Sequence, residues 1–171
     1  MPADLIRAAS LSPAPILEAV ERYRGTIVDL DAQRAWGPDE FAHFREALAV
    51  RLRQAGLRPG ARVLMALPNG PLFVATLAAI LACEASPLLL HHKAPAAELL
   101  RYAERFCADF VASEPSEIDV SADLLGRTTA IAADDAAALQ WTELRASART
   151  GLGPLLRGVR EQLWASRLGT R

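Results

Sequence analysis

The sequence has little net charge, few cysteines and only one lysine. Its 171 residues carry 19 basic and 20 acidic side chains, a formal net charge of −1, so no excess of one sign points to nucleic acid or to a membrane surface as a partner. Cys83 and Cys107 are too few for a disulfide framework. Each lies within or at the end of an apolar helical segment, which favours buried, reduced thiols.

No segment has the features of a secretion signal or of a membrane span. Asp4, Arg7 and Pro13 interrupt the beginning of the chain, which excludes the continuous apolar core of a signal peptide. The most apolar stretch, residues 72–82, would span only about 16 Å as a helix, roughly half of a bilayer core. These absences predict a cytoplasmic globular protein with no membrane and no nucleic-acid partner.

The clearest pattern is a strand, a helix and a second strand within residues 55–90. Residues 62–67 form a short apolar run bounded by glycine and proline, which is typical of a strand buried on both faces. Residues 69–71 read Asn-Gly-Pro and begin a helix that is apolar on every side through Ala82, so other elements must enclose it. A parallel strand is predicted at residues 86–90, reached by a right-handed crossover.

Further elements are predicted on both sides of this unit. The longest is a helix that begins after Gly37, carries acidic residues in its first turn and ends at Gly56. The others are a helix at 16–24, a β-hairpin at 26–36, a helix at 96–106 and strands at 109–112 and 128–132. We therefore predict an α/β fold, with a parallel or mostly parallel sheet built from repeated βαβ units, helices on both faces, and a helix and short β-hairpin before it.

Composition divides the chain into three parts. Residues 1–15 contain small side chains and prolines and predict a loosely held lead. Residues 16–133 form the predicted α/β subdomain. Residues 134–171 are weakly patterned and become rich in arginine, with at best an isolated amphipathic helix at 155–168.

Three short motifs follow one another at recognisable spacing. They are Gly56-Leu57-Arg58-Pro59-Gly60-Ala61-Arg62-Val63, then Leu67-Pro68-Asn69 and Pro87-Leu88. In this order they resemble the N-terminal subdomain of the acyl-adenylate-forming superfamily, the AMP-dependent synthetases and ligases, and the looser similarity covers residues 25–113. The chain departs from that pattern where Ala61 replaces an aspartate and where Cys83-Glu84-Ala85 replaces Ala-Gly-Ala.

The resemblance implies ATP-dependent activation of a carboxylic acid to an acyl-adenylate. Transfer to a thiol such as coenzyme A or carrier-protein pantetheine would follow, and the complete enzyme would use ATP and Mg²⁺. That chemistry needs a glycine- and hydroxyl-rich phosphate loop with a lysine. The sequence has no such loop, and Lys93 is its only lysine. We therefore expect no catalytic, cofactor-binding or metal-binding residue in this chain, which is predicted to be truncated before the phosphate loop and inactive alone.

His91, His92 and Lys93 are the candidate substrate-binding residues. They follow the second strand of the central unit, at the sheet edge where open α/β folds place ligands. Adjacent side chains on an extended segment point to opposite sides, so we expect the two imidazoles not to share a metal ion or a substrate atom. A polar loop is the simpler interpretation, and a substrate contact is the alternative.

Three functional hypotheses remain open, the last of which is a small-molecule-binding module that uses the His91 loop. In the first, the chain is the N-terminal portion of a ligase and its partner is the rest of that enzyme, although an unpaired sheet edge would also favour self-association. In the second, it is a non-catalytic interaction or scaffold module derived from the same family. The arginine-rich residues 145–171 have two explanations of equal weight, a shifted reading frame in GC-rich DNA or a basic helix lying on the acidic segment before it.

Overall fold

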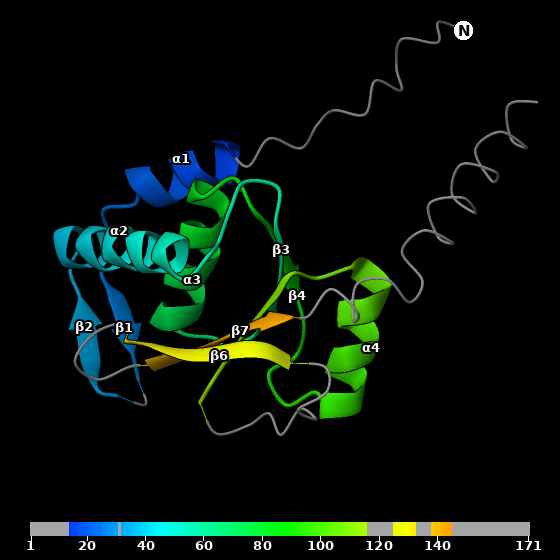
Figure 1. Ribbon diagram of the computed structural model, residues 1–171. Helices are drawn as coiled ribbons and strands as arrows, with labels where there is room; N and C mark the ends of the chain where they lie inside the picture. Colours follow the sequence, from blue (N-terminus) through cyan, green and yellow to red (C-terminus); the bar gives the residue numbers. More distant parts are fainter. Residues whose placement is uncertain (1–13, 31, 116–124, 133–137, 145–171) are drawn as a thin grey trace, which may run out of the picture.

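The computed structural model describes residues 14–30, 32–115, 125–132 and 138–144. In this part of the chain, helices pack against a five-stranded sheet and a separate two-stranded hairpin (Figure 1). The helices are α1 (Ala14–Arg22), α2 (Pro38–Gln54), α3 (Pro71–Ala82) and α4 (Ala96–Phe106). The predicted α/β architecture with a leading helix and hairpin is confirmed.

The hairpin consists of β1 (Ile27–Asp29) and β2 (Arg34–Trp36), which pair antiparallel. Trp36 is buried and stacks on Phe44 of α2, with the ring centroids 4.7 Å apart. The Arg34 guanidinium lies 3.6 Å from the centroid of the Trp36 ring and 2.8 Å from the Glu40 carboxylate. These contacts fix the hairpin against the first turns of α2.

The five-stranded sheet has the order β4-β3-β5-β7-β6. Its strands are β3 (Arg62–Ala66), β4 (Ser86–Leu89), β5 (Phe110–Ser113), β6 (Leu125–Ala132) and β7 (Ala138–Leu144). β3 pairs parallel with β4 and with β5, and helices α3 and α4 make the two crossovers, as the sequence predicts. β7 pairs antiparallel with both β5 and β6, so the sheet is mixed.

β7 comes from residues that the sequence analysis treated as weakly patterned. Its position between β5 and β6 makes it an interior strand rather than an appendage. Trp141 is 1% exposed and stacks on Phe110 of β5, with ring centroids 4.9 Å apart, and Leu139 is fully buried. The sheet therefore extends past residue 133. The predicted helix at 155–168 lies outside the described residues.

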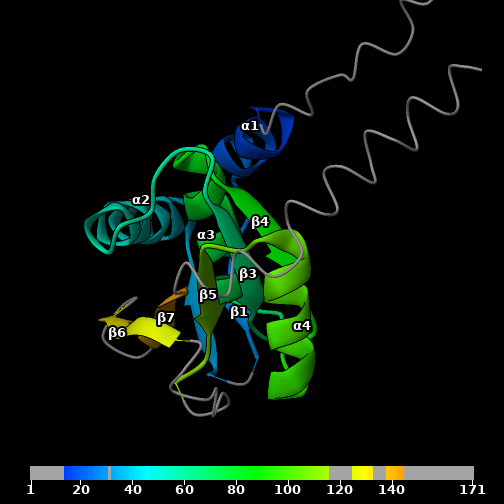
Figure 2. The same cartoon turned by 45° about the vertical axis from the view of Figure 1, so that its right-hand side comes forward.

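Helices cover both faces of the sheet (Figure 2), and each face has its own apolar core. Val63 and Met65 of β3 point into the larger core, which α2 and α3 cover, whereas Leu64 and Ala66 point into a smaller core with Leu99 of α4. Burial on both sides explains why β3 is a continuous apolar run and not an alternating one. Helices on both faces are thus confirmed.

α3 is enclosed as its all-apolar sequence requires. It lies between α2 and the sheet, with α1 beside it (Figures 1 and 2). Both Ala75 and Ile80 are completely buried. Within the described ranges, no helix has the length and apolarity needed to cross a bilayer.

Three helices end in the same way, in a Schellman motif. One residue just past each helix has a left-handed backbone: Gly56 (φ 96°) and Glu84 (φ 56°), two residues after the ends of α2 and α3, and Cys107 (φ 51°), directly after α4. The next amide then donates to a carbonyl in the last helical turn, as in Leu57 N–H to Leu52 O at 2.9 Å, Ala85 to Ile80 at 3.1 Å and Ala108 to Ala103 at 2.8 Å. These sharp stops turn the chain directly into β3, β4 and β5.

Candidate functional site

The carboxyl ends of the three parallel strands lie at one edge of the sheet. The segment Leu67–Gly70 follows β3, His91–Lys93 follows β4, and Ser113 is the last residue of β5. Ser113 is only 2% exposed, whereas His91 and Lys93 are exposed and His92 is half-buried. This is the position at which the sequence predicted a ligand contact.

The prediction that the His91 and His92 side chains point to opposite sides is wrong. The His91 and His92 rings lie side by side, with centroids 4.7 Å apart and planes inclined by 31°. The physical reason is that β4 ends at Leu89 and the chain turns at His92 and Lys93, so the alternation of an extended strand no longer applies. The Lys93 N–H donates to His91 Nδ1 at 3.2 Å, and the Ala94 N–H donates to the His91 carbonyl at 2.9 Å.

This histidine pair supplies two imidazoles and no third ligand. In the part of the chain that the structure describes, no three histidine, cysteine, aspartate or glutamate side chains are grouped to hold a metal ion. One ring nitrogen of His91 already accepts the Lys93 amide. Together with the Lys93 ammonium, the loop has the groups to contact an anionic or polar substrate atom, and a substrate-binding role for His91, His92 and Lys93 stays a prediction.

The glycine-containing turn between α2 and β3 uses its amides internally. Gly56 N–H donates to the Arg53 carbonyl at 3.0 Å, and Gly60 N–H donates to the Glu84 carbonyl at 2.8 Å. The Ala61 N–H donates to the Arg58 carbonyl at 3.1 Å, and the Ala61 side chain is buried in the larger core. The turn therefore ends a helix and begins a strand, as the sequence predicts, and its amides do not form a phosphate cradle.

Asp109 joins the beginnings of β3 and β5, a role that the sequence analysis did not identify. Its Oδ2 accepts the Arg62 N–H at 3.0 Å, and its Oδ1 lies 3.2 Å from the Arg58 guanidinium. The aspartate side chain is 15% exposed, and its backbone N–H donates to the Arg62 carbonyl at 2.8 Å. This carboxylate is positioned to hold two strands together and not to act on a ligand.

The two cysteines are free. Cys83 is buried at the end of α3, and its thiol lies 3.7 Å from the Ala49 carbonyl. Burial raises the pKa of the Cys83 thiol, and the nearby Arg53 charge offsets part of that increase. A buried neutral thiol is a poor nucleophile, so Cys83 serves packing, as predicted. Cys107 is half-buried at the end of α4.

Comparison with known proteins identifies relatives of this fold. Residues 16–156 match the family described as AMP-binding enzyme. The N-terminal subdomain of NpsA from Klebsiella oxytoca is similar, with a TM-score of 0.53 and 19% identity over 62% of this chain and 28% of that one. The o-succinylbenzoate coenzyme A synthetase of Bacillus subtilis has a TM-score of 0.53 and 19% identity over 60% of this chain and 27% of that one.

A benzoate CoA ligase from Burkholderia xenovorans LB400 is similar as well, with a TM-score of 0.51 and 16% identity over 60% of this chain and 21% of that one. No curated protein matches the sequence. The chain thus spans less than a third of the length of these solved structures. At such identities the structures establish a shared fold, and the sequence match over residues 16–156 establishes the shared family.

Proposed function

Because this chain belongs to the AMP-binding enzyme family, we propose that it is the N-terminal part of a ligase that activates a carboxylic acid as its acyl-adenylate. The acyl group then passes to a thiol such as coenzyme A or carrier-protein pantetheine. ATP and Mg²⁺ are the cofactors of the complete enzyme, and its remaining part is the partner of this chain. The two free thiols support a cytoplasmic location.

The family match over residues 16–156 carries this proposal. It includes β7, whose Trp141 and Leu144 are buried and whose partners are β5 and β6. An enzyme of this kind must hold triphosphate with convergent amides and a lysine. Lys93 is the only lysine in the sequence, and the Gly56, Gly60 and Ala61 amides of the α2–β3 turn are already bonded within the protein. The chain alone is therefore proposed to be inactive.

Acid-dependent exchange of pyrophosphate into ATP tests this inactivity. The purified chain is expected to give no exchange with benzoate, anthranilate or o-succinylbenzoate, and calorimetric titration with ATP and Mg²⁺ is expected to give no heat above dilution. Exchange by the chain alone would refute the proposal that the chain is inactive without the rest of the enzyme.

A non-catalytic interaction module is the second candidate. One observation favours it: the described part of the chain builds an apolar core on each face of its sheet. A module of this kind would be a stable monomer with a specific protein partner. Light scattering separates the two candidates, because a sheet that normally continues into further protein is expected to associate.

A further inference from the structure

Helix α1 has an apolar stripe that is only partly covered. Ile16 and Ala19 of α1, and Tyr23 just after it, follow one another at helical spacing, and Ile16 is 52% and Tyr23 47% exposed. By contrast, Phe41 and Leu52 on the apolar face of α2 are at most 5% exposed. An amphipathic helix normally buries its apolar stripe against another segment. In the part of the chain that the structure describes, no segment buries the α1 stripe to that degree.

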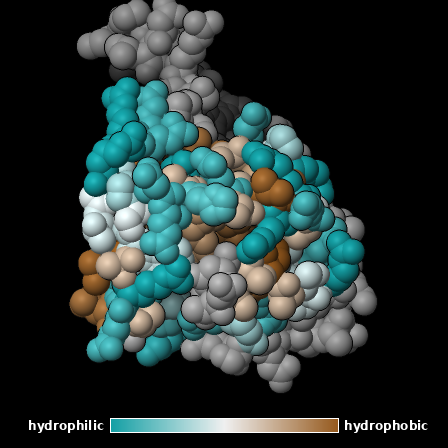
Figure 3. Space-filling model, turned by 90° about the vertical axis from the view of Figure 1, so that its left-hand side faces the viewer, coloured by the Kyte–Doolittle hydropathy of each residue, from teal (hydrophilic) through white to brown (hydrophobic). Residues whose placement is uncertain are grey.

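The stripe borders an apolar hollow between α1, β1, α2 and α3. The hollow has a volume of about 470 Å³, and its lining includes Ala19, Val20, Ile27, Phe41 and Val74. Val20, Ile27 and Val74 also pack against the larger core, which fixes the walls of the hollow. Figure 3 shows apolar side chains reaching the surface on the side of α1, α2 and the hairpin, with hydrophilic ones around them.

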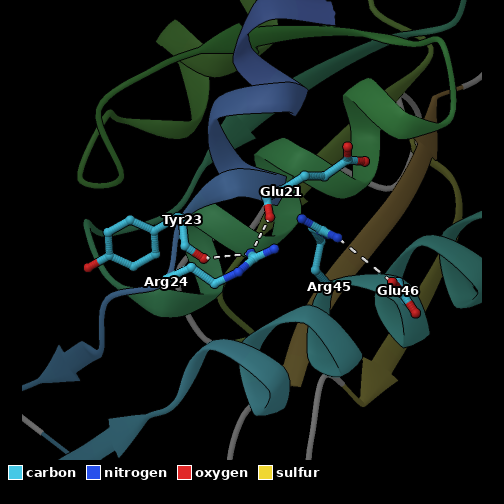
Figure 4. Close-up of polar contacts among 5 residues, drawn as sticks. All are labelled: Glu21, Tyr23, Arg24, Arg45 and Glu46. Atoms are coloured by element: carbon cyan, nitrogen blue, oxygen red, sulfur yellow. Dashed lines mark hydrogen bonds and ion pairs between the residues drawn. The ribbon is translucent and has the colours of Figure 1, made fainter.

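One end of this region carries both signs of charge. A polar cavity of about 30 Å³ shares part of its lining with the hollow and is also lined by Glu21, Arg24 and Arg45. Figure 4 shows these three side chains, with Arg45 coming from α2 and the other two from the end of α1 and just after it. Arg45 lies 3.8 Å from the Glu46 carboxylate, whose side chain is 71% exposed, and such a pair contributes little. A segment with one acid and one base beside its apolar residues therefore suits this surface.

The small size of the stripe favours an occupant that is already attached to this chain. Stable interfaces between separate chains take about 20–30 residues on each side, whereas α1 has nine residues in all. A separate partner would also lose its freedom to translate and rotate when it binds. A short tethered segment is present at an effective concentration in the millimolar range, so a small apolar contact is enough to hold it.

Residues 1–13 are attached at the rim of the hollow. Pro15, at the beginning of α1, belongs to the lining of the hollow. Residues 4–7 read Asp-Leu-Ile-Arg, an apolar pair between one acid and one base. The nine residues before α1 reach about 30 Å when extended, and α1 is only about 13 Å long. The apolar pair can therefore return over the whole stripe.

We propose that residues 1–13 fold back over α1 and that Leu5 and Ile6 fill the hollow. Burial of these two aliphatic side chains, together with the exposed side of the stripe, supplies the stabilisation. The flanking acid and base then meet the charges at the polar end. The fold-back ties down a segment that the sequence alone predicts to be loosely held, and it does not depend on the proposed ligase activity.

Nuclear Overhauser effects in the full chain, labelled at isoleucine and leucine methyl groups, test the contact. The Ile6 methyl groups are expected to give cross-peaks to the rings of Tyr23 and Phe41. Ala19→Phe fills the hollow and should remove them. Ala97→Phe, at an exposed position of α4, is the matched control and should leave them unchanged. The absence of these cross-peaks from the parent protein would overturn the proposal.

Cleavage by trypsin after Arg7 is the second test. A docked segment is cleaved only when it opens, so the rate reports the open population. Ala19→Phe should raise this rate about tenfold, the effect of displacing one aliphatic side chain from an apolar site. Ala97→Phe should be cleaved at the parent rate, and equal rates in the two variants would overturn the proposal. Melting temperatures show that both variants fold.

A second copy of the chain is the competing occupant. Two samples with different isotope labels are mixed, and cross-peaks between copies would refute the fold-back. Protection from trypsin that falls on dilution would refute it as well. Protection that does not depend on protein concentration, with cross-peaks within one copy, supports it.

Discussion

Glu84 occupies a backbone conformation that glycine adopts at lower cost. Its φ of 56° lies in the left-handed region, at the turn where α3 ends. We expect Glu84→Gly to raise the free energy of unfolding by about 0.5 kcal/mol, because the strain relieved exceeds the extra freedom of glycine in the unfolded chain. Chemical denaturation measures the change. Glu84→Ala keeps the strain and should give no such gain; equal stabilisation by both variants would place the cause in the side chain.

Cys83 should make the protein less stable at alkaline pH. Burial raises the pKa of its thiol in the folded state, so above the unfolded pKa of about 8.5 the unfolded chain has released a proton that the folded chain retains. The free energy of unfolding should then fall as the pH rises through that value. Denaturation from pH 7 to pH 10 should show this fall in the parent protein and a smaller one in Cys83→Ala. Parallel curves would exclude the thiol as the cause.

The histidine loop shows where inference from local sequence succeeds and where it fails. The position of His91, His92 and Lys93 at the carboxyl edge of the sheet followed from the βαβ pattern, because strand direction is fixed by a crossover helix. The relative orientation of the two imidazoles depended on where β4 ends. If the extended backbone is one residue longer or shorter, the ring points to the opposite side of the strand. No local signal in the sequence fixed the residue at which β4 ends.

β7 was missed for a related reason. Its sequence, Ala-Leu-Gln-Trp-Thr-Glu-Leu, has apolar residues at Leu139 and Trp141 separated by polar ones, the alternation of a half-buried strand. That alternation was present but short. The sequence also has no recognisable tight-turn motif that would have predicted the pairing of β7 with β5 or β6. The elements predicted well were those with a cap, a sharp end or a continuous apolar run. The place of β7 inside the sheet depends on its pairing with β5, about thirty residues earlier in the chain, and local sequence carries no mark of that pairing.

β4 is an edge strand in the described sheet, and its exposed edge should promote self-association. Leu89 is 59% exposed at the end of this strand. Leu89→Lys should reduce association measured by light scattering, because a lysine on an edge opposes pairing with another strand. Val50→Lys, on the exposed side of α2, removes a comparable apolar side chain away from the edge and should leave association unchanged. A monomeric parent protein, or equal effects of both variants, would exclude the edge as the interface.

The fold as a whole was predictable because the five consecutive elements from β3 to β5 are neighbours both in the sequence and in the structure. Strand, helix and strand follow one another with short turns from β3 to β5, so the sequence alone indicates the order of elements and their parallel pairing. The mixed character of the sheet was not predictable, since it depends on how β6 and β7 return to β5.

A fusion protein tests most directly the proposal that this chain is the N-terminal part of a ligase and is inactive without the rest of the enzyme. Residues 16–144 would replace the structurally matched N-terminal part of the Bacillus subtilis o-succinylbenzoate coenzyme A synthetase. The intact synthetase is the positive control, and the synthetase remainder without any replacement is the negative control. We predict that o-succinylbenzoate-dependent pyrophosphate exchange appears in the fusion and is absent from this chain and from the remainder alone. A fusion that melts cooperatively yet gives no exchange would contradict the account.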